Sequence, residues 1–134
     1  MTHDTGGPDE RLREASFVGF VPVRDLAVAK DFYVGALGLT VTDENPFAVV
    51  IDACGTTIRL TEVPDLSPQP FTIAGWEVSN INAMVRSLEL LGVVFHRYDG
   101  IDQDELGVWT TPGGDAIAWF ADPDGNTLSL TMLA

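Results

Sequence analysis

A seven-residue pattern occurs twice in this chain and constrains its fold more than any other feature. Residues 55–61 and 125–131 both read Gly-x-Thr-apolar-x-Leu-Thr, and apolar residues alternate with polar ones in both. Such alternation predicts a β-strand with one buried face. Two copies, one in the middle of the chain and one near its end, indicate a protein built from two similar halves.

The segments around the two copies follow one another in the same order, which is strand, helix and then three strands. In the first half we predict strands at 17–23, 39–43, 47–52 and 57–62 and a helix at 26–37. In the second half we predict strands at 71–78, 93–98 and 125–131, a hairpin or broken strand at 108–121, and a helix at 81–91. Asp25 and Asn80 can cap the two helices, and Gly38 and Gly92 can end them.

This order predicts an α+β fold of two βαβββ modules. We expect a flexible tail at 1–15, a first module at 16–63, a proline-rich linker at 64–70 and a second module at 71–134. Neither half can bury its sheet alone, so the modules should pack into one compact domain, 16–134, around a shared concavity with the helices outside.

Composition narrows the classes of partner. The 134 residues carry 20 Asp and Glu against 7 Lys and Arg, and the formal net charge is -13. Strong acidity disfavours nucleic acid and anionic membranes, because both are bound through basic patches. The charge either keeps the protein soluble or attracts a cationic partner. One cysteine, Cys54, allows no internal disulfide, and the N-terminus has no export signal, so we expect a cytoplasmic protein.

Three motifs carry a family resemblance. They are Asp31-Phe32-Tyr33, Leu37-Gly38-Leu39 and the run from Phe120 to Asn126, Phe-Ala-Asp-Pro-Asp-Gly-Asn. With the repeat, they make residues 17–132 similar to the vicinal oxygen chelate superfamily, which includes glyoxalase I, extradiol dioxygenases and bleomycin resistance proteins. The resemblance implies a curled, cup-like mixed sheet with pseudo-twofold symmetry, helices outside it, and assembly as a homodimer.

The enzymes of that superfamily hold a divalent metal at four strand positions in the cup. Mapped through the motifs, these positions are Val18, Arg59, Ile73 and Ser129. Divalent metals prefer imidazole, carboxylate or thiolate ligands, and none of these is present. Shifting the register by one or two residues reaches no His, Asp, Glu or Cys either. We therefore expect no metal and no cofactor.

The residues that should line the cup suit polar recognition. Period-two alternation points Thr57, Arg59, Thr61 and Ser129 inward. Arg59 can grip an anionic group of a ligand, or it can form a buried ion pair with Glu77 that replaces the metal. Both readings stay open.

Other candidates lie in the second half. His96 and Tyr98 share one face of their predicted strand, where they either form an acid–base or binding pair or have only a structural role. Trp109 lies beside the acidic run 102–105 and is a candidate for the rim of a pocket, whereas strand parity puts Trp76 in the core. Cys54 has no basic neighbour in the sequence that would lower its pKa, which argues against a nucleophile.

These residues lead to one principal hypothesis and two alternatives. The first is a metal-independent homodimer that binds a small molecule, similar to the bleomycin-resistance branch, and sequesters a ligand or drug without chemistry. The second is a glyoxalase- or dioxygenase-like lyase or isomerase with a non-standard metal site or none. The third is a structural dimer module whose cup is filled by side chains.

Overall fold

A computed structural model describes residues 11–134 and contains two four-stranded mixed sheets. The first module consists of β1 (Val18–Val23), α1 (Leu26–Lys30), the π-helix η3 (Asp31–Ala36), β2 (Thr40–Asn45), β3 (Ala48–Ala53) and β4 (Thr56–Glu62). The second consists of β5 (Thr72–Glu77), α2 (Ile81–Leu90), β6 (Trp109–Thr110), β7 (Ala116–Ala121) and β8 (Thr127–Met132). A short 3-10 turn, η2 (Leu12–Glu14), precedes β1.

The two sheets have the same topology. Their strand orders are β1-β4-β3-β2 and β5-β8-β7-β6. In each, the first strand runs parallel to the last, and the other pairs are antiparallel. The repeated sequence pattern forms β4 and β8, which occupy the same place in their sheets. The predicted α+β fold of two repeated modules is thus confirmed.

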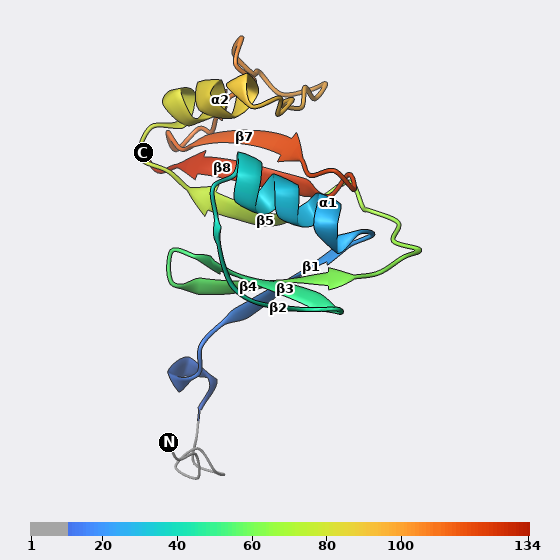
Figure 1. Ribbon diagram of the computed structural model, residues 1–134. Helices are drawn as coiled ribbons and strands as arrows, with labels where there is room; N and C mark the ends of the chain where they lie inside the picture. Colours follow the sequence, from blue (N-terminus) through green and yellow to red (C-terminus); the bar gives the residue numbers. More distant parts are fainter. Residues whose placement is uncertain (1–10) are drawn as a thin grey trace.

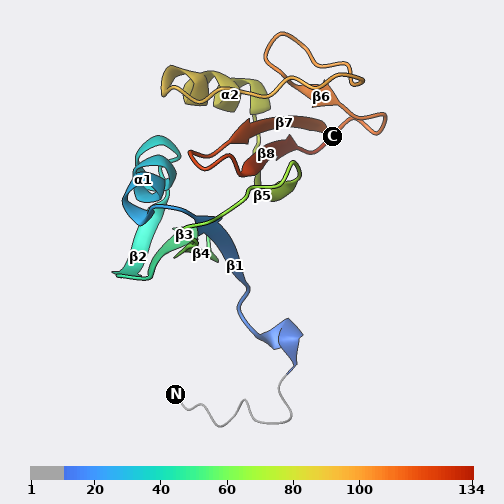
Figure 2. The same cartoon turned by 90° about the vertical axis from the view of Figure 1, so that its right-hand side faces the viewer.

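Each sheet is covered by a helix on one face only. In Figures 1 and 2, α2 lies across β7 and β8, and α1 lies against β3 and β4 of the other sheet. The sheets do not close into a barrel. We call the face of each sheet that carries no helix its open face.

The predicted helix caps form. Asp25 Oδ1 accepts hydrogen bonds from the backbone N–H groups of Ala27 and Val28, at 2.9 and 3.1 Å. Asn80 Oδ1 accepts one from Ala83 N–H at 3.1 Å. Since the first backbone donors of a helix have no partner inside it, such caps fix where a helix begins.

The turn from Asp122 to Asn126 joins the two modules. Asn126 Nδ2 donates to the carbonyl of Pro22 at 2.8 Å and to Asp122 Oδ2 at 2.9 Å. The hydroxyl of Tyr33 donates to the same Asp122 oxygen at 2.7 Å. Arg24 adds an ion pair with Asp124 at 3.3 Å. A motif that marks the superfamily in the sequence therefore stabilises the contact between the halves.

One hydrophobic core spans both modules. Its largest fully buried side chains come from η3 and sheet one as well as from α2 and sheet two: Val23, Tyr33, Ile51, Leu60, Ile81, Val85, Phe120 and Leu128. Burial of apolar area on this scale is the main stabilising term of a domain. The core thus holds the modules as one packed unit.

The predicted strand at 93–98 is wrong. In this segment only Phe95 forms a bridge, to Phe120, and the edge of sheet two continues as the two-residue β6. The acidic loop between these fragments interrupts the edge strand. Gln103 closes the loop by donating to the carbonyls of His96 and Gly107, at 3.0 and 2.8 Å, and by accepting from Tyr98 N–H at 2.7 Å.

Two other predictions are not tested by the described residues. The expected tail at 1–15 lies largely outside the described residues, and the division of the chain at 63/64 and 70/71 stays a prediction. Within residues 11–134, no helix is long and apolar enough to cross a membrane.

Candidate functional site

Strand β4 points its polar side chains to the open face. Thr57, Arg59 and Thr61 alternate with Ile58 and the fully buried Leu60, as period two requires. In the sheet, Arg59 lies between Phe20 of β1 and Val50 of β3. Its guanidinium is therefore carried by a half-buried, mainly apolar stretch of the open face.

The predicted ion pair between Arg59 and Glu77 does not form. Arg24–Asp124 and Lys30–Glu44 are ion pairs between side chains of residues 11–134, and the side chain of Arg59 has no ion-pair or hydrogen-bond partner in this range. Glu77 shares the parity of Gly75 on β5, as predicted, but its side chain is exposed to solvent. Solvation of the carboxylate removes the need for a buried cation beside it.

The strand register shows which residues lie beside Arg59 and Ser129 in the sheets. Phe20, not Val18, lies beside Arg59. A β-bulge between Thr72 and Ala74 displaces Ile73 from the regular register, so Gly75 lies beside Ser129. The mapping of the metal positions onto Val18, Arg59, Ile73 and Ser129 stays a prediction, and Phe20 and Gly75 join Arg59 and Ser129 as the residues found side by side there.

This set does not fit a divalent metal. Phe20 and Gly75 have no donor atom in their side chains, Ser129 offers a neutral hydroxyl, and Arg59 repels a cation. Among the residues that the structure describes, no three His, Cys, Asp or Glu side chains group in a way that could hold a metal ion. The chain's own residues thus offer no place for the metal of the superfamily's enzymes.

Gly75 and Ser129 approach each other closely. A Cβ atom placed at Gly75 would overlap Ser129 Oγ and would lie 3.1 Å from the Ser129 carbonyl oxygen. Only glycine leaves that space free. Ser129 itself is buried, so the centre of the open face of sheet two has a flat, small-residue floor.

An aromatic group borders this floor. Trp109 of β6 and Trp119 of β7 are stacked, with ring centroids 6.2 Å apart and planes 23° apart. Tyr98 meets Trp119 edge to face at 5.4 Å. We call these three residues the aromatic platform. Its rings present a polarisable surface to any planar molecule on the open face.

His96 supports the platform. Its Nδ1 lies 2.9 Å from the hydroxyl of Tyr98, and its backbone N–H donates to the carbonyl of Trp119 at 2.7 Å. Burial raises the pKa of Tyr98, which keeps its hydroxyl protonated near neutral pH. The two side chains therefore meet as predicted, although they lie on a loop and not on a strand.

A cavity of about 360 Å³ opens beside the platform. Its lining comes from the start of the second module, the acidic loop and sheet two: Pro70, Phe71, Thr72, Tyr98, Ile101, Trp109, Trp119 and Thr127. This volume falls within the range of small-molecule sites. The mixture of aromatic rings with two threonine hydroxyls suits a flat, partly polar ligand.

The structure thus brings together part of the predicted set. Tyr98 and Trp109 line the cavity and His96 contacts Tyr98, whereas Thr57, Arg59 and Thr61 lie on the other module. Trp119 is the centre of the platform, whereas the sequence placed it only among the aromatic residues that could wall a pocket and favoured Trp109 for the rim. Its position between the buried Ala118 and Phe120 was the available signal, since alternation puts it on the open face.

The chain matches a known protein superfamily. The sequence model of the Glyoxalase/Bleomycin resistance protein/Dioxygenase superfamily matches residues 15–130. The chain belongs to this superfamily. No curated protein matches the chain.

Solved structures of the superfamily share the fold over nearly the whole chain. A putative glyoxalase family protein from Bacillus anthracis is 12% identical, with a TM-score of 0.71 over 90% of this chain and 95% of that one. Lactoylglutathione lyase from Agrobacterium tumefaciens is 15% identical, with a TM-score of 0.69 over 88% and 92%. TnmS3, an antibiotic binding protein from Streptomyces sp. CB03234, is 26% identical, with a TM-score of 0.67 over 90% and 96%.

Proposed function

We propose that this protein binds a small molecule on the open face of sheet two and sequesters it without a metal. The observation that carries the proposal is the cavity beside the stacked Trp109 and Trp119. The residues at the metal positions support it, because they lack suitable donors. The likeness to TnmS3, an antibiotic binding protein, makes antibiotics the first class of ligand to test.

Arg59 adds a second element to the proposed recognition. It is a cation without a partner among the described residues, and its planar fork matches a carboxylate or phosphate. The net charge of -13 favours cationic ligands at long range. A zwitterionic drug fits both observations, because it carries an anionic group for Arg59 and a cationic group that the net charge attracts. Arg59 does not line the cavity beside the platform, so its part in binding is tested separately below.

The test is a tryptophan fluorescence titration of EDTA-dialysed protein with a panel of antibiotics, bleomycin among them. A saturable change with at least one compound is expected. Replacing Trp119 with Leu should weaken the binding by about 5- to 150-fold, since a stacked ring contributes about 1–3 kcal/mol. Arg86→Ala, on α2, is the matched control and should bind normally.

Three results test whether binding needs a metal, whether the ligand lies at the platform and whether Arg59 takes part. Loss of binding after chelation would show that a metal is needed, contrary to the proposal. Unchanged affinity in Trp119→Leu would place the ligand elsewhere. Arg59→Ala distinguishes an anionic contact, because it should weaken only the compounds that carry a carboxylate or phosphate.

A second candidate function is catalysis by His96 and Tyr98. Their contact of 2.9 Å at the edge of the cavity is the observation that favours it, since a histidine beside a protonated phenol can transfer a proton. Elemental analysis separates the candidates first: about one Ni, Zn, Fe or Mn per chain favours a lyase, isomerase or dioxygenase over pure binding.

We also propose that the protein forms a homodimer through exposed apolar residues at the start of the first module. Phe17 and Phe20 are 74% and 65% exposed, and Val18, 41% exposed, lies between them. Large apolar side chains gathered in this way mark interaction surfaces. Light scattering should give twice the mass of one chain.

Charge at this surface should break the dimer. Phe17→Glu combined with Phe20→Glu is expected to give a folded monomer. Phe47→Glu is the matched control, because Phe47 is 77% exposed on the β2–β3 turn. A monomeric parent protein would refute the proposal and would leave the structural dimer module without support.

A further inference from the structure

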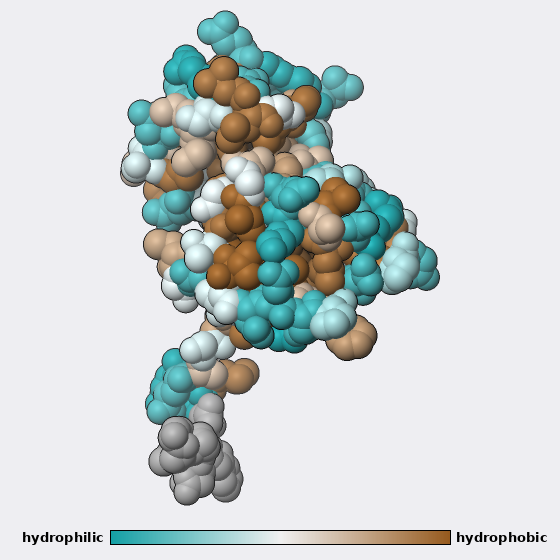
Figure 3. Space-filling view, viewed as in Figure 1, coloured by the Kyte–Doolittle hydropathy of each residue, from teal (hydrophilic) through white to brown (hydrophobic). Residues whose placement is uncertain are grey.

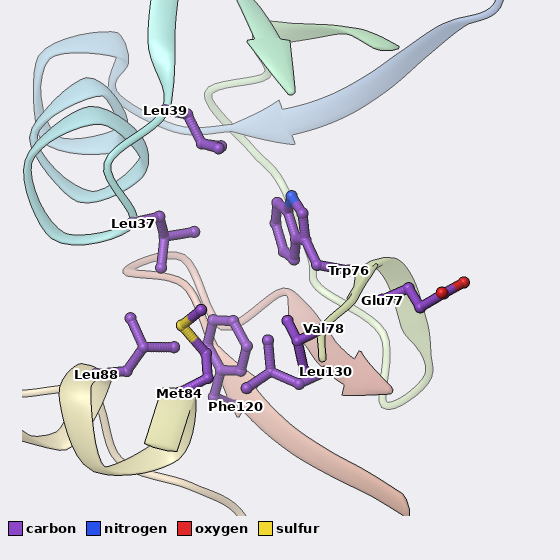
Figure 4. A pocket seen from close by; sticks show the side chains of 9 residues that line it. All are labelled: Leu37, Leu39, Trp76, Glu77, Val78, Met84, Leu88, Phe120 and Leu130. Atoms are coloured by element: carbon purple, nitrogen blue, oxygen red, sulfur yellow. The ribbon is translucent and has the colours of Figure 1, made fainter. Parts of the chain in front are cut away.

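A second cavity lies on the opposite, helix-covered side, where the two modules meet. It has a volume of about 140 Å³. Both modules contribute to its lining: Leu37, Leu39, Trp76, Glu77, Val78, Met84, Leu88, Phe120 and Leu130. Figure 4 shows Leu37, Met84 and Leu88 directed toward the ring of Phe120, with Trp76 closing another side. We call this cavity the junction pocket.

The lining of the junction pocket is almost wholly apolar. Trp76 and Phe120 are stacked, with ring centroids 6.5 Å apart, and aliphatic chains and the thioether of Met84 complete the wall. The carboxylate of Glu77 points away from the pocket in Figure 4. Entry of a charged group would therefore cost its hydration with no partner in return.

The approach to the pocket is also apolar on one side. Figure 3 shows hydrophobic atoms exposed over α2, bordered by hydrophilic ones. Met84 of α2 is 38% exposed, so its side chain belongs both to the wall and to the surface. A small molecule can thus reach the pocket by displacing one flexible side chain.

The π-helix η3 positions the residues of the first module that line the pocket. The N–H of Leu37 donates to the carbonyl of Phe32 at 2.9 Å, which is the wide i to i-5 turn of a π-helix. Gly38 then has a φ of +75°, and the chain reverses so that Leu39 also borders the pocket. π-Helical turns are uncommon and are frequent at functional sites.

We propose that the junction pocket is a binding site for a small, uncharged, apolar molecule of about the size of benzene or a short alkyl group. Apolar cavities of about 150 Å³ stay dry and take up benzene. The junction pocket matches that size and chemistry. Its occupant would contact both modules at once and would fill a space that the protein's own side chains leave empty.

This site is distinct from the open face. On β5, Trp76 alternates with Gly75, and on β7, Phe120 alternates with Trp119. The junction pocket and the platform therefore lie on opposite faces of the same strands. The proposal does not depend on the function assigned to the open face, and either can fail alone.

The indole N–H signals of the three tryptophans report on the two sites separately. Benzene titrated into ¹⁵N-labelled protein should shift the Trp76 signal in a saturable way and leave those of Trp109 and Trp119 in place. Benzene at ten times its Kd should also raise Tm by about 2–6 °C, because a ligand of the native state stabilises it. No shift at Trp76, or equal shifts of all three signals, would overturn the proposal.

Two substitutions give the matched comparison. Met84→Trp fills the mouth of the pocket from a partly exposed position and should weaken benzene binding at least tenfold while the protein stays folded. Trp119→Leu, on the open face, should bind benzene as the parent does. If Met84→Trp binds benzene normally, or if Trp119→Leu loses the effect, the site is not the junction pocket.

Discussion

Tyr33 is wholly buried, and its hydroxyl donates to Asp122 across the contact between the modules. Replacing it with Phe removes the donor and leaves a buried carboxylate oxygen with one partner fewer. We expect the free energy of unfolding to fall by about 1–3 kcal/mol, measured by urea denaturation. Tyr98→Phe, at a partly exposed position, is the control and should cost less than half as much.

The same residue predicts a pH dependence. Burial, and then the charge of Asp122, raises the pKa of Tyr33 above its ordinary value of about 10. The folded state thus holds this proton more tightly than the unfolded chain. The contribution of this proton to the free energy of unfolding is complete below about pH 10 and is lost as the pH rises further. The Tyr33→Phe variant should therefore lose less stability above about pH 10.

Gly75 gives a second prediction for a single residue. Gly75→Ala places a methyl group against Ser129 Oγ and should destabilise the protein by about 1–3 kcal/mol. Ser129→Ala removes the overlapping atom, so the double variant should regain part of that loss. Simple additivity of the two single effects in denaturation curves would show that the contact is not the cause.

Among elements, the sequence predicted those whose signals are local. Alternation in β4 and β8 and the caps at Asp25 and Asn80 are set by neighbouring residues, and all four appear in the structure. Features that depend on distant partners were missed. The bulge at Ile73 is defined only by the pairing of β5 with β8, and it places Gly75 beside Ser129.

The candidate site shows the same difference between features set by neighbouring residues and features set by distant ones. Strand parity predicted that Trp76 faces the helices and that Arg59 faces the open side of its sheet. Alternation allows this because it depends only on the strand itself. The ion pair with Glu77 required knowledge of two modules' relative placement, which no local pattern contains. The edge strand at 93–98 failed for a related reason: apolar residues there suit a strand, but the loop that follows breaks the pairing after Phe95.

The loop between Phe95 and β6 depends on one side chain. Gln103 makes three hydrogen bonds to backbone groups of the loop's two ends. Gln103→Ala should speed amide exchange at Tyr98 at least tenfold and weaken any ligand bound at the platform. Gln103→Glu is the sharper comparison, because it keeps the acceptor for Tyr98 N–H and loses both donors. If neither variant changes exchange, the loop is held by other contacts.

At the scale of the whole molecule, the shared core predicts that both modules unfold together. Their fully buried side chains form one cluster, and neither sheet has a second helix to cover it. In calorimetry the parent protein should show one transition whose van't Hoff and calorimetric enthalpies agree. Asn126 is the residue with which to test this, since its amide joins Pro22 of one module to Asp122 of the other.

Asn126→Ala removes those contacts and should lower the free energy of unfolding by about 1–3 kcal/mol, because the groups left behind are buried. Asn45→Ala is the matched control: it also deletes two hydrogen bonds of an asparagine side chain, but both lie within the β2–β3 hairpin. It should cost about 0.5–1.5 kcal/mol. Equal costs would mean that the Asp122–Asn126 turn stabilises only its own module. A larger cost for Asn126→Ala, with a broader transition, is the result that a joint between modules requires.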